Sequence, residues 1–143
     1  MKATVKQVPI RQRLSRWNLI RFQVLAWCSL RSIQVTNSDI DTLVLLAILG
    51  KTKLTILCEE LIKTELSTGP KIKKCKGIDK EYKYIFDTKQ SARNELGKMI
   101  GLGLVKREGK NKSNIKVWLN PEMDIHTEQN LLVNYQLLTI ESD

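Results

Sequence analysis

Histidine and closely spaced cysteine are nearly absent from this chain of 143 residues. The single histidine is His126, and the three cysteines, Cys28, Cys58 and Cys75, stand far apart with no paired spacing. Because a structural zinc ion takes its four ligands from closely spaced Cys and His residues, we expect no metal site. An odd number of unpatterned cysteines is typical of reduced thiols in a cytosolic setting, not of a disulfide framework.

Motifs of catalysis are also lacking. The sequence contains no Gly-rich phosphate loop and no nucleophile motif, and the pair Gly101-x-Gly103 is better explained as the end of a helix. His126 stands alone near an acidic tail, where we expect it to be exposed. We therefore predict that the protein is not an enzyme and that it binds no cofactor.

Long hydrophobic runs are missing as well. The apolar stretches 22–30 and 43–50 are much shorter than the roughly 20 residues that a membrane-spanning helix needs. The basic start of the chain is not followed by a short apolar run with a small-residue cleavage site, so we expect no signal peptide and no membrane partner.

Acidic residues are absent from positions 1–38, and basic residues are absent from positions 123–143. The first segment carries seven Lys and Arg side chains, the middle of the chain 17 basic and 11 acidic ones, and the last segment four acidic ones. The net charge of +9 favours a polyanionic partner, such as nucleic acid or an acidic protein surface. The uneven placement predicts a basic arm, a basic body and an acidic tail.

Apolar periodicity predicts several helices. We expect one within 11–34, one beginning at Ser38 and ending at Gly50, one capped by Thr52, and one capped by Asp87 that ends at Gly101. The apolar stripes at 40–48, 54–62 and 92–100 should form one core with Val105, Val117 and Leu119. Residues 104–119 are typical of a β-hairpin, and the lysine-rich residues 71–86 of a second hairpin with its turn at 77–80. The pattern at 131–140 fits a strand or a helix equally well.

The stretch SARNELGKMIGLGLVKREGKNKSNIKVWLNP, residues 91–121, resembles the recognition-helix-and-wing segment of winged-helix regulators and of plasmid and phage replication proteins. The resemblance covers roughly residues 38–121. It implies an α+β fold with a three-helix winged-helix domain and a C-terminal β-hairpin wing. The composition of the residues before it adds a basic helical arm. The expected parts are therefore a Trp- and Arg-rich arm at 1–36, a winged-helix domain at 37–121 with a lysine-rich insert at 70–86, and an acidic tail at 122–143.

The third helix of that domain and its wing offer candidate nucleic-acid ligands. A polar helix face of this kind could enter a major groove, where Arg pairs with guanine and Asn or Gln with adenine, while wing lysines contact phosphates. A merely solvated helix face and turn explain the same pattern. The candidate residues are Lys89, Gln90, Arg93, Asn94, Lys98, Lys106, Arg107, Lys110, Lys112 and Lys116.

The segment 1–36 has more apolar residues than one small core can cover, interleaved with arginines. We predict that it is an assembly arm that binds a partner, and that the acidic 122–143 tail of a neighbouring copy is one candidate partner. A helix that packs on its own domain is the alternative. The candidate partner-binding residues are Arg13, Arg16, Trp17, Arg21, Phe22 and Trp27.

Two hypotheses of function follow. The first is a non-enzymatic structural subunit of a large assembly, such as a connector or neck ring of a phage particle, with a winged-helix module close to DNA. The second is a winged-helix DNA-binding regulator or replication protein of a phage or mobile element. The expected partners are other copies of the chain or other assembly proteins, with duplex DNA as a further candidate, in the virion or the host cytoplasm.

Overall fold

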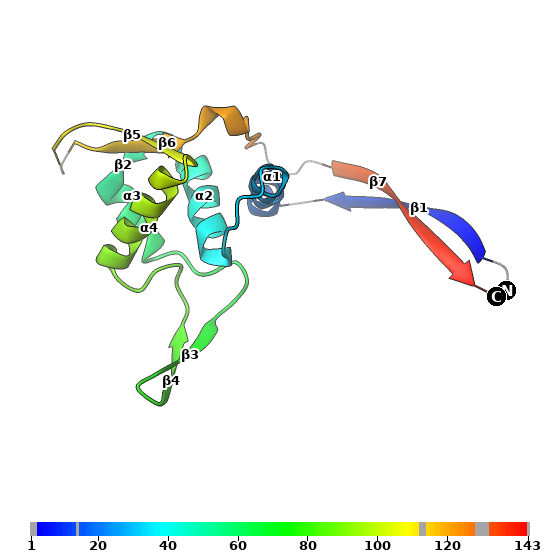
Figure 1. The fold of residues 1–143 in the computed structure, drawn as a ribbon, viewed down its shortest axis with the longest axis horizontal. Coiled ribbons are helices and arrows are strands. Elements are labelled where there is room, and N and C mark those ends of the chain that lie inside the picture. The colour runs from blue at the N-terminus through cyan, green and yellow to red at the C-terminus, as the bar shows by residue number, and fades with distance from the viewer. Residues whose placement is uncertain (1–2, 14, 112–113, 128–131, 143) are drawn as a thin grey trace.

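The computed structural model describes residues 3–13, 15–111, 114–127 and 132–142, and over these residues the fold is α+β, with four α-helices and small antiparallel sheets (Figure 1). A helical body carries two β-ribbons that project from it. The elements are β1 (Ala3–Arg13), α1 (Arg16–Leu30), α2 (Asn37–Leu49), β2 (Thr52–Lys53), α3 (Leu54–Leu61), β3 (Lys71–Cys75), β4 (Ile78–Tyr82), α4 (Lys89–Gly101), β5 (Val105–Glu108), β6 (Lys116–Leu119), a 3-10 turn η1 (Pro121–Met123) and β7 (Leu132–Ser142).

The helices begin at different residues from those expected. In α2 the N-cap is Thr36, not Ser38, because Thr36 and Asp39 form a capping box that satisfies two backbone N–H groups at once. In α4 the N-cap is Thr88, whose hydroxyl accepts from the Ser91 N–H. Thr52 does not cap α3, because it pairs with β6 as part of β2. The expected end of α2 at Gly50 is confirmed, with φ of +72°.

One continuous core fills the body. It joins buried residues of all four helices to those of β5 and β6, among them Leu43, Leu57, Leu96 and Val117, each at most 1% exposed. The expected stripes therefore do meet in a single core. Removing several such side chains from water is the main favourable term in folding a chain of this size.

Helix α1 belongs to this core, and the prediction that residues 1–36 lie outside it is wrong for this helix. Ile20, Val24 and Cys28 are fully buried and pack against the rest of the core cluster. The reason is that α1 has apolar residues on more than one side, and one of these sides is covered by α2. Figure 1 shows α1 beside α2, on the side of the body that faces the ribbon formed by β1 and β7.

The body has one three-stranded antiparallel sheet, in the order β2–β6–β5. The hairpin expected at 104–119 is confirmed as β5 and β6. Its turn needs glycine at position 109, where φ is +106° and a Cβ would lie 2.6 Å from the Asn114 carbonyl oxygen. After β6, the buried Asn120 donates from its side chain to the Gly103 carbonyl at 2.9 Å and accepts from the Glu122 N–H. The Leu-Asn-Pro ending thus ties β6 to the end of α4.

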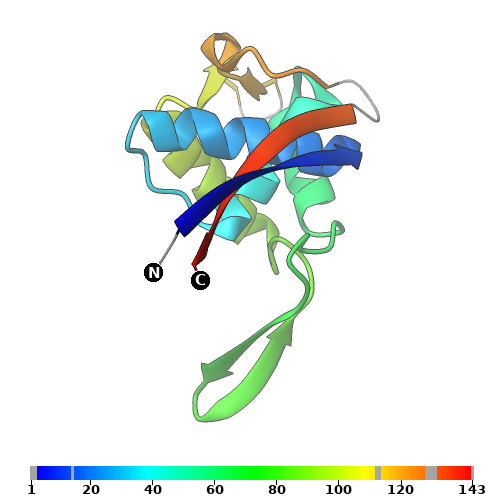
Figure 2. The same ribbon diagram turned by 90° about the vertical axis from the view of Figure 1, so that its right-hand side faces the viewer.

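The lysine-rich hairpin is also confirmed, as β3 paired with β4. It follows α3 and precedes α4 in the chain, and it projects away from the body (Figures 1 and 2). Its turn lies at Lys76–Gly77, slightly earlier than expected. Both residues have positive φ, +55° and +80°, which is the conformation of a two-residue turn whose twist matches that of the flanking strands. Gly77 adopts it without a steric cost.

The second ribbon joins the two ends of the chain. β1 and β7 form 11 antiparallel residue pairs, from Ala3 with Ser142 to Arg13 with Leu132. This pairing settles the open question at 131–140, where the described residues 132–140 are a strand. Arm and tail of one chain pair with each other here, and the expectation that the tail meets the arm of a neighbouring copy stays a prediction. The ribbon extends away from the helical body, beyond α1 (Figure 1).

Candidate nucleic-acid and partner interfaces

Helix α4 presents a polar face to solvent. All five of its candidate DNA ligands, Lys89, Gln90, Arg93, Asn94 and Lys98, are exposed. Gln90 and Asn94 hydrogen-bond each other, with 3.0 Å between Gln90 Nε2 and Asn94 Oδ1. The opposite face buries Ala92, Leu96 and Met99. The expected division of α4 into an inner and an outer face is therefore present.

The fifth candidate, Lys98, has a structural contact that the sequence did not indicate. Its Nζ lies 3.0 Å from Oδ2 of Asp39, whose side chain is almost fully buried, while the Lys98 side chain is about half exposed. The ion pair links the first turn of α2 to the last turn of α4. Because Lys98 already neutralises a buried carboxylate, it is a poorer phosphate ligand than its exposed neighbours.

A second carboxyl group lies beside Asp39. Glu95 is only 9% exposed, and burial, followed by a hydrogen bond to Asp39 and the negative charge of Asp39, raises its pKa from 4.5 to about 8. Burial acts to raise the pKa of Asp39 too, but hydrogen bonds from Glu95, the Thr36 backbone and Lys98 outweigh it and lower that pKa. At neutral pH the pair therefore holds a proton on Glu95 and a negative charge on Asp39. No local pattern marks this pair, because its two members lie on different helices.

The β5–β6 hairpin exposes the expected basic residues Lys106, Arg107, Lys110 and Lys116, while Lys112 lies outside the described residues. The acidic residue Glu108 of β5 forms an ion pair with Lys51. Its Oε1 lies 2.8 Å from Lys51 Nζ, and this hydrogen bond lowers the pKa of Glu108. The described part of the hairpin is thus basic on its exposed surface.

The outer side of α1 carries exposed apolar residues. Phe22 is 64% exposed and Leu30 is 84% exposed, and Leu25 between them is also exposed. Leu25 lies three residues and Leu30 eight residues from Phe22, and these spacings place both on the same side of the helix as Phe22. We call these three residues the outer α1 stripe. Leu30 was missed as a candidate, although its helical spacing from Phe22 was a usable signal.

Four expected partner residues of α1 contact their own chain instead. Trp17 and Trp27 are partly buried against the core, Arg16 Nε donates to the Thr127 carbonyl at 2.9 Å, and Arg21 Nη2 donates to Asn37 Oδ1 at 3.0 Å. These four side chains therefore have contacts within their own domain, and their role in binding a partner stays a prediction. Phe22 is exposed and is therefore accessible to a partner. The side chain of Arg13 is not among those that the structure describes.

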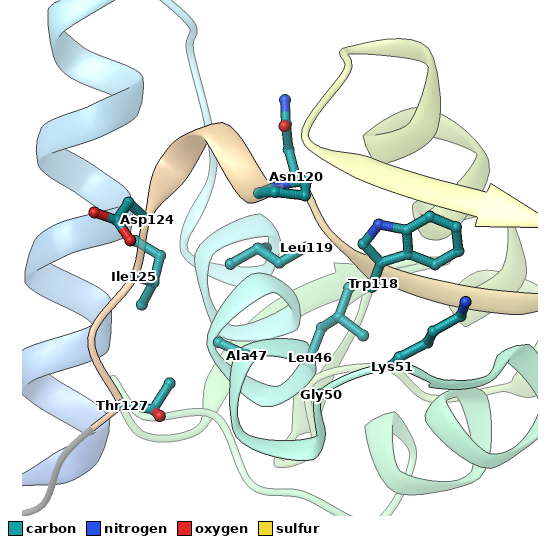
Figure 3. A pocket seen from close by; sticks show the side chains of 11 residues that line it. Leu46, Ala47, Gly50, Lys51, Trp118, Leu119, Asn120, Asp124, Ile125 and Thr127 are labelled. Atoms are coloured by element: carbon teal, nitrogen blue, oxygen red, sulfur yellow. The ribbon is translucent and has the colours of Figure 1, made fainter.

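A pocket of about 310 Å³ lies between the end of α2, β6 and the segment that follows η1 (Figure 3). Leu46, Ala47 and Leu119 give it apolar walls, and Lys51 lies with its Nζ 4.5 Å from the centre of the Trp118 ring. Asp124 contributes a carboxylate. The residues that line this pocket include no nucleophile–base pair.

Comparison with protein-family models, with curated proteins and with solved structures finds no match for this chain. None of the helices in the described parts of the chain is both long and apolar enough to cross a membrane. The function is therefore argued from three surfaces: the outer face of α4, the β5–β6 hairpin and the outer α1 stripe.

Proposed function

We propose that this chain is a non-enzymatic structural subunit of a large assembly, built on a winged-helix module and placed close to DNA. A connector or neck ring of a phage particle is an assembly of this kind. Support for the winged-helix module comes from the order α2, β2, α3, α4, β5, β6 and from the sheet order β2–β6–β5. In this arrangement α4 occupies the place of the recognition helix and the β5–β6 hairpin that of the wing.

The outer α1 stripe is the observation that carries the assembly role. One side of α1 is fully used in the core, yet Phe22, Leu25 and Leu30 remain open to water on the other. A helix that is apolar on several sides is normally covered on several sides. Exposed apolar patches of this kind mark association sites, so a partner protein is expected to cover the stripe.

The β1–β7 ribbon supports the same role. It consists of two strands only, which is marginal for a sheet in water, and its outer edges carry backbone groups without a strand partner in the described sheet. The ribbon lies on the same side of the helical body as α1 (Figures 1 and 2). Contact with a neighbouring subunit would stabilise the ribbon and bury the stripe together.

The experiment compares the sedimentation of the full chain with that of a Phe22→Ser/Leu30→Ser double variant over a range of concentrations. We expect the wild type to assemble and the variant to remain smaller, because two apolar anchors become polar. Ile72→Ser is the matched control, since Ile72 is 71% exposed but lies on the β3–β4 hairpin. An unchanged sedimentation of the double variant would remove the stripe from the assembly.

A winged-helix regulator or replication protein is the second candidate function. It is favoured by the exposure of Lys89, Gln90, Arg93 and Asn94 on one helix, which gives α4 the donors and acceptors of a base-reading surface. The two functions differ in what they require: a regulator needs a preferred DNA sequence, whereas a structural subunit near DNA needs only contact with phosphates.

A further inference from the structure

The β3–β4 hairpin carries its charges unevenly on its two faces. Its register pairs Lys71 with Tyr82 and Lys73 with Lys80, and paired residues share a face while successive residues alternate. One face, which we call the basic hairpin face, therefore has three lysines and no acid. It consists of Lys71, Lys73, Cys75, Ile78, Lys80 and Tyr82. The opposite face has one lysine and two acids, at Lys74, Asp79 and Glu81, together with Ile72.

Two lysines of the basic hairpin face stand directly opposite each other. Lys73 and Lys80 are cross-strand partners, and like charges in that position destabilise a sheet. Both ammonium groups lie over the Tyr82 ring, 5.9 Å and 5.1 Å from its centre, and Lys80 Nζ is also 3.4 Å from Oδ2 of Asp87. Asp87 thus pairs with Lys80, and an added anion would relieve the repulsion that remains between the two lysines.

The base of the basic hairpin face opens onto a pocket of about 250 Å³. This pocket brings the hairpin next to the beginnings of α2 and α4, so the basic hairpin face adjoins the helix that carries the candidate DNA ligands. The residues that carry this contact are Lys71, Lys73 and Tyr82 from the hairpin, Ser38 and Ser91 from the two helices, and Asp87 between them.

We propose that the basic hairpin face is a second DNA-binding element, which holds the phosphate backbone of duplex DNA beside α4. The inference rests on the proposed position of the protein close to DNA and adds a contact outside α4 and the β5–β6 hairpin. A two-stranded ribbon is narrow enough to follow a groove of B-DNA, and exposed ammonium groups suit phosphate oxygens. A phosphate between Lys73 and Lys80 removes their repulsion, while Tyr82 keeps both side chains in place.

The test uses the matched pair Lys73→Ala and Lys74→Ala in the full chain. These neighbours lie on one strand and lose the same charge, but they occupy opposite faces of the hairpin. Affinity for a duplex of mixed sequence is measured between about 50 and 200 mM salt, where each phosphate contact contributes about 0.9 to the slope of log K against log salt. We expect Lys73→Ala to reduce that slope by about 0.9 and Lys74→Ala to leave it at the wild-type value. Lys80→Ala, on the same face as Lys73, should repeat the result.

Equal slopes for the Lys73 and Lys74 variants would overturn the proposal, because a diffuse attraction does not distinguish the faces. A wild type that binds no duplex at the lowest salt would overturn it as well. Neither result bears on the outer α1 stripe, which is judged by sedimentation without DNA. Failure of this inference and failure of the assembly role can therefore be told apart.

Discussion

Replacing Glu95 by glutamine should make the stability of the protein much less dependent on pH. In the folded chain the pKa of Glu95 is about 8, against 4.5 for an ordinary glutamate. Below pH 4.5 the carboxyl is protonated in both states, and between 4.5 and 8 the unfolded chain loses the proton first. The free energy of unfolding therefore falls as pH rises through this window and is lowest once the folded state also ionises.

The size of the effect follows from the same values. Each pKa unit corresponds to about 1.36 kcal/mol, so the rise from 4.5 to about 8 limits the loss to about 5 kcal/mol. The side-chain amide of the Glu95→Gln variant keeps a donor for Asp39 but cannot ionise, so the variant should match the wild type near pH 5 and exceed it near pH 8. The coupled change at Asp39 lies at lower pH, because the pKa of that carboxyl is lowered from 3.8.

Urea unfolding followed by circular dichroism at several pH values between 5 and 8.5 measures this difference. Glu59→Gln, at an exposed position of α3, is the control and should keep the wild-type pH dependence. If the Glu95 variant loses stability with pH as steeply as the wild type, the buried pair does not hold the proton assigned to it.

Three further outcomes are expected. Leu96→Ala should cost about 2–5 kcal/mol in urea unfolding, because Leu96 is buried at the centre of the core, and a loss below about 1 kcal/mol would contradict the core packing. Gly109→Ala should destabilise the chain, because the added Cβ would meet the Asn114 carbonyl. Gly97→Ala, on the exposed side of α4, should instead stabilise the chain by about 0.5–1 kcal/mol. If α4 reads bases, Arg93→Ala should relax the preference at one base pair by about 1–3 kcal/mol, and equal binding of all duplexes by the wild type would exclude that role.

Elements with local signals could be predicted from the sequence. The β3–β4 and β5–β6 hairpins follow from alternating apolar residues and from glycines in their turns, and the end of α2 follows from Gly50. Capping was less certain, because several Ser, Thr and Asp residues compete near each helix start. Thr36, and not Ser38, is the N-cap of α2, because Thr36 forms a reciprocal capping box with Asp39.

Features that depend on distant residues could not be predicted. The pairing of Ala3 with Ser142 and the ion pair of Lys98 with Asp39 join positions far apart in the chain, and neither has a local pattern. The sequence of α1 shows apolar residues on several sides but does not indicate which side the domain itself covers. For this reason the sequence predicts either an arm or a helix packed on its own domain, and it does not distinguish the buried Val24 from the exposed Leu30.

The mass of the natively purified chain, measured by light scattering with and without duplex DNA, tests the assembly role most directly. The account predicts a defined multiple of the 16.5 kDa chain mass that is present without DNA. A chain that stays monomeric at every concentration, and that gains mass only when DNA is added, would contradict it.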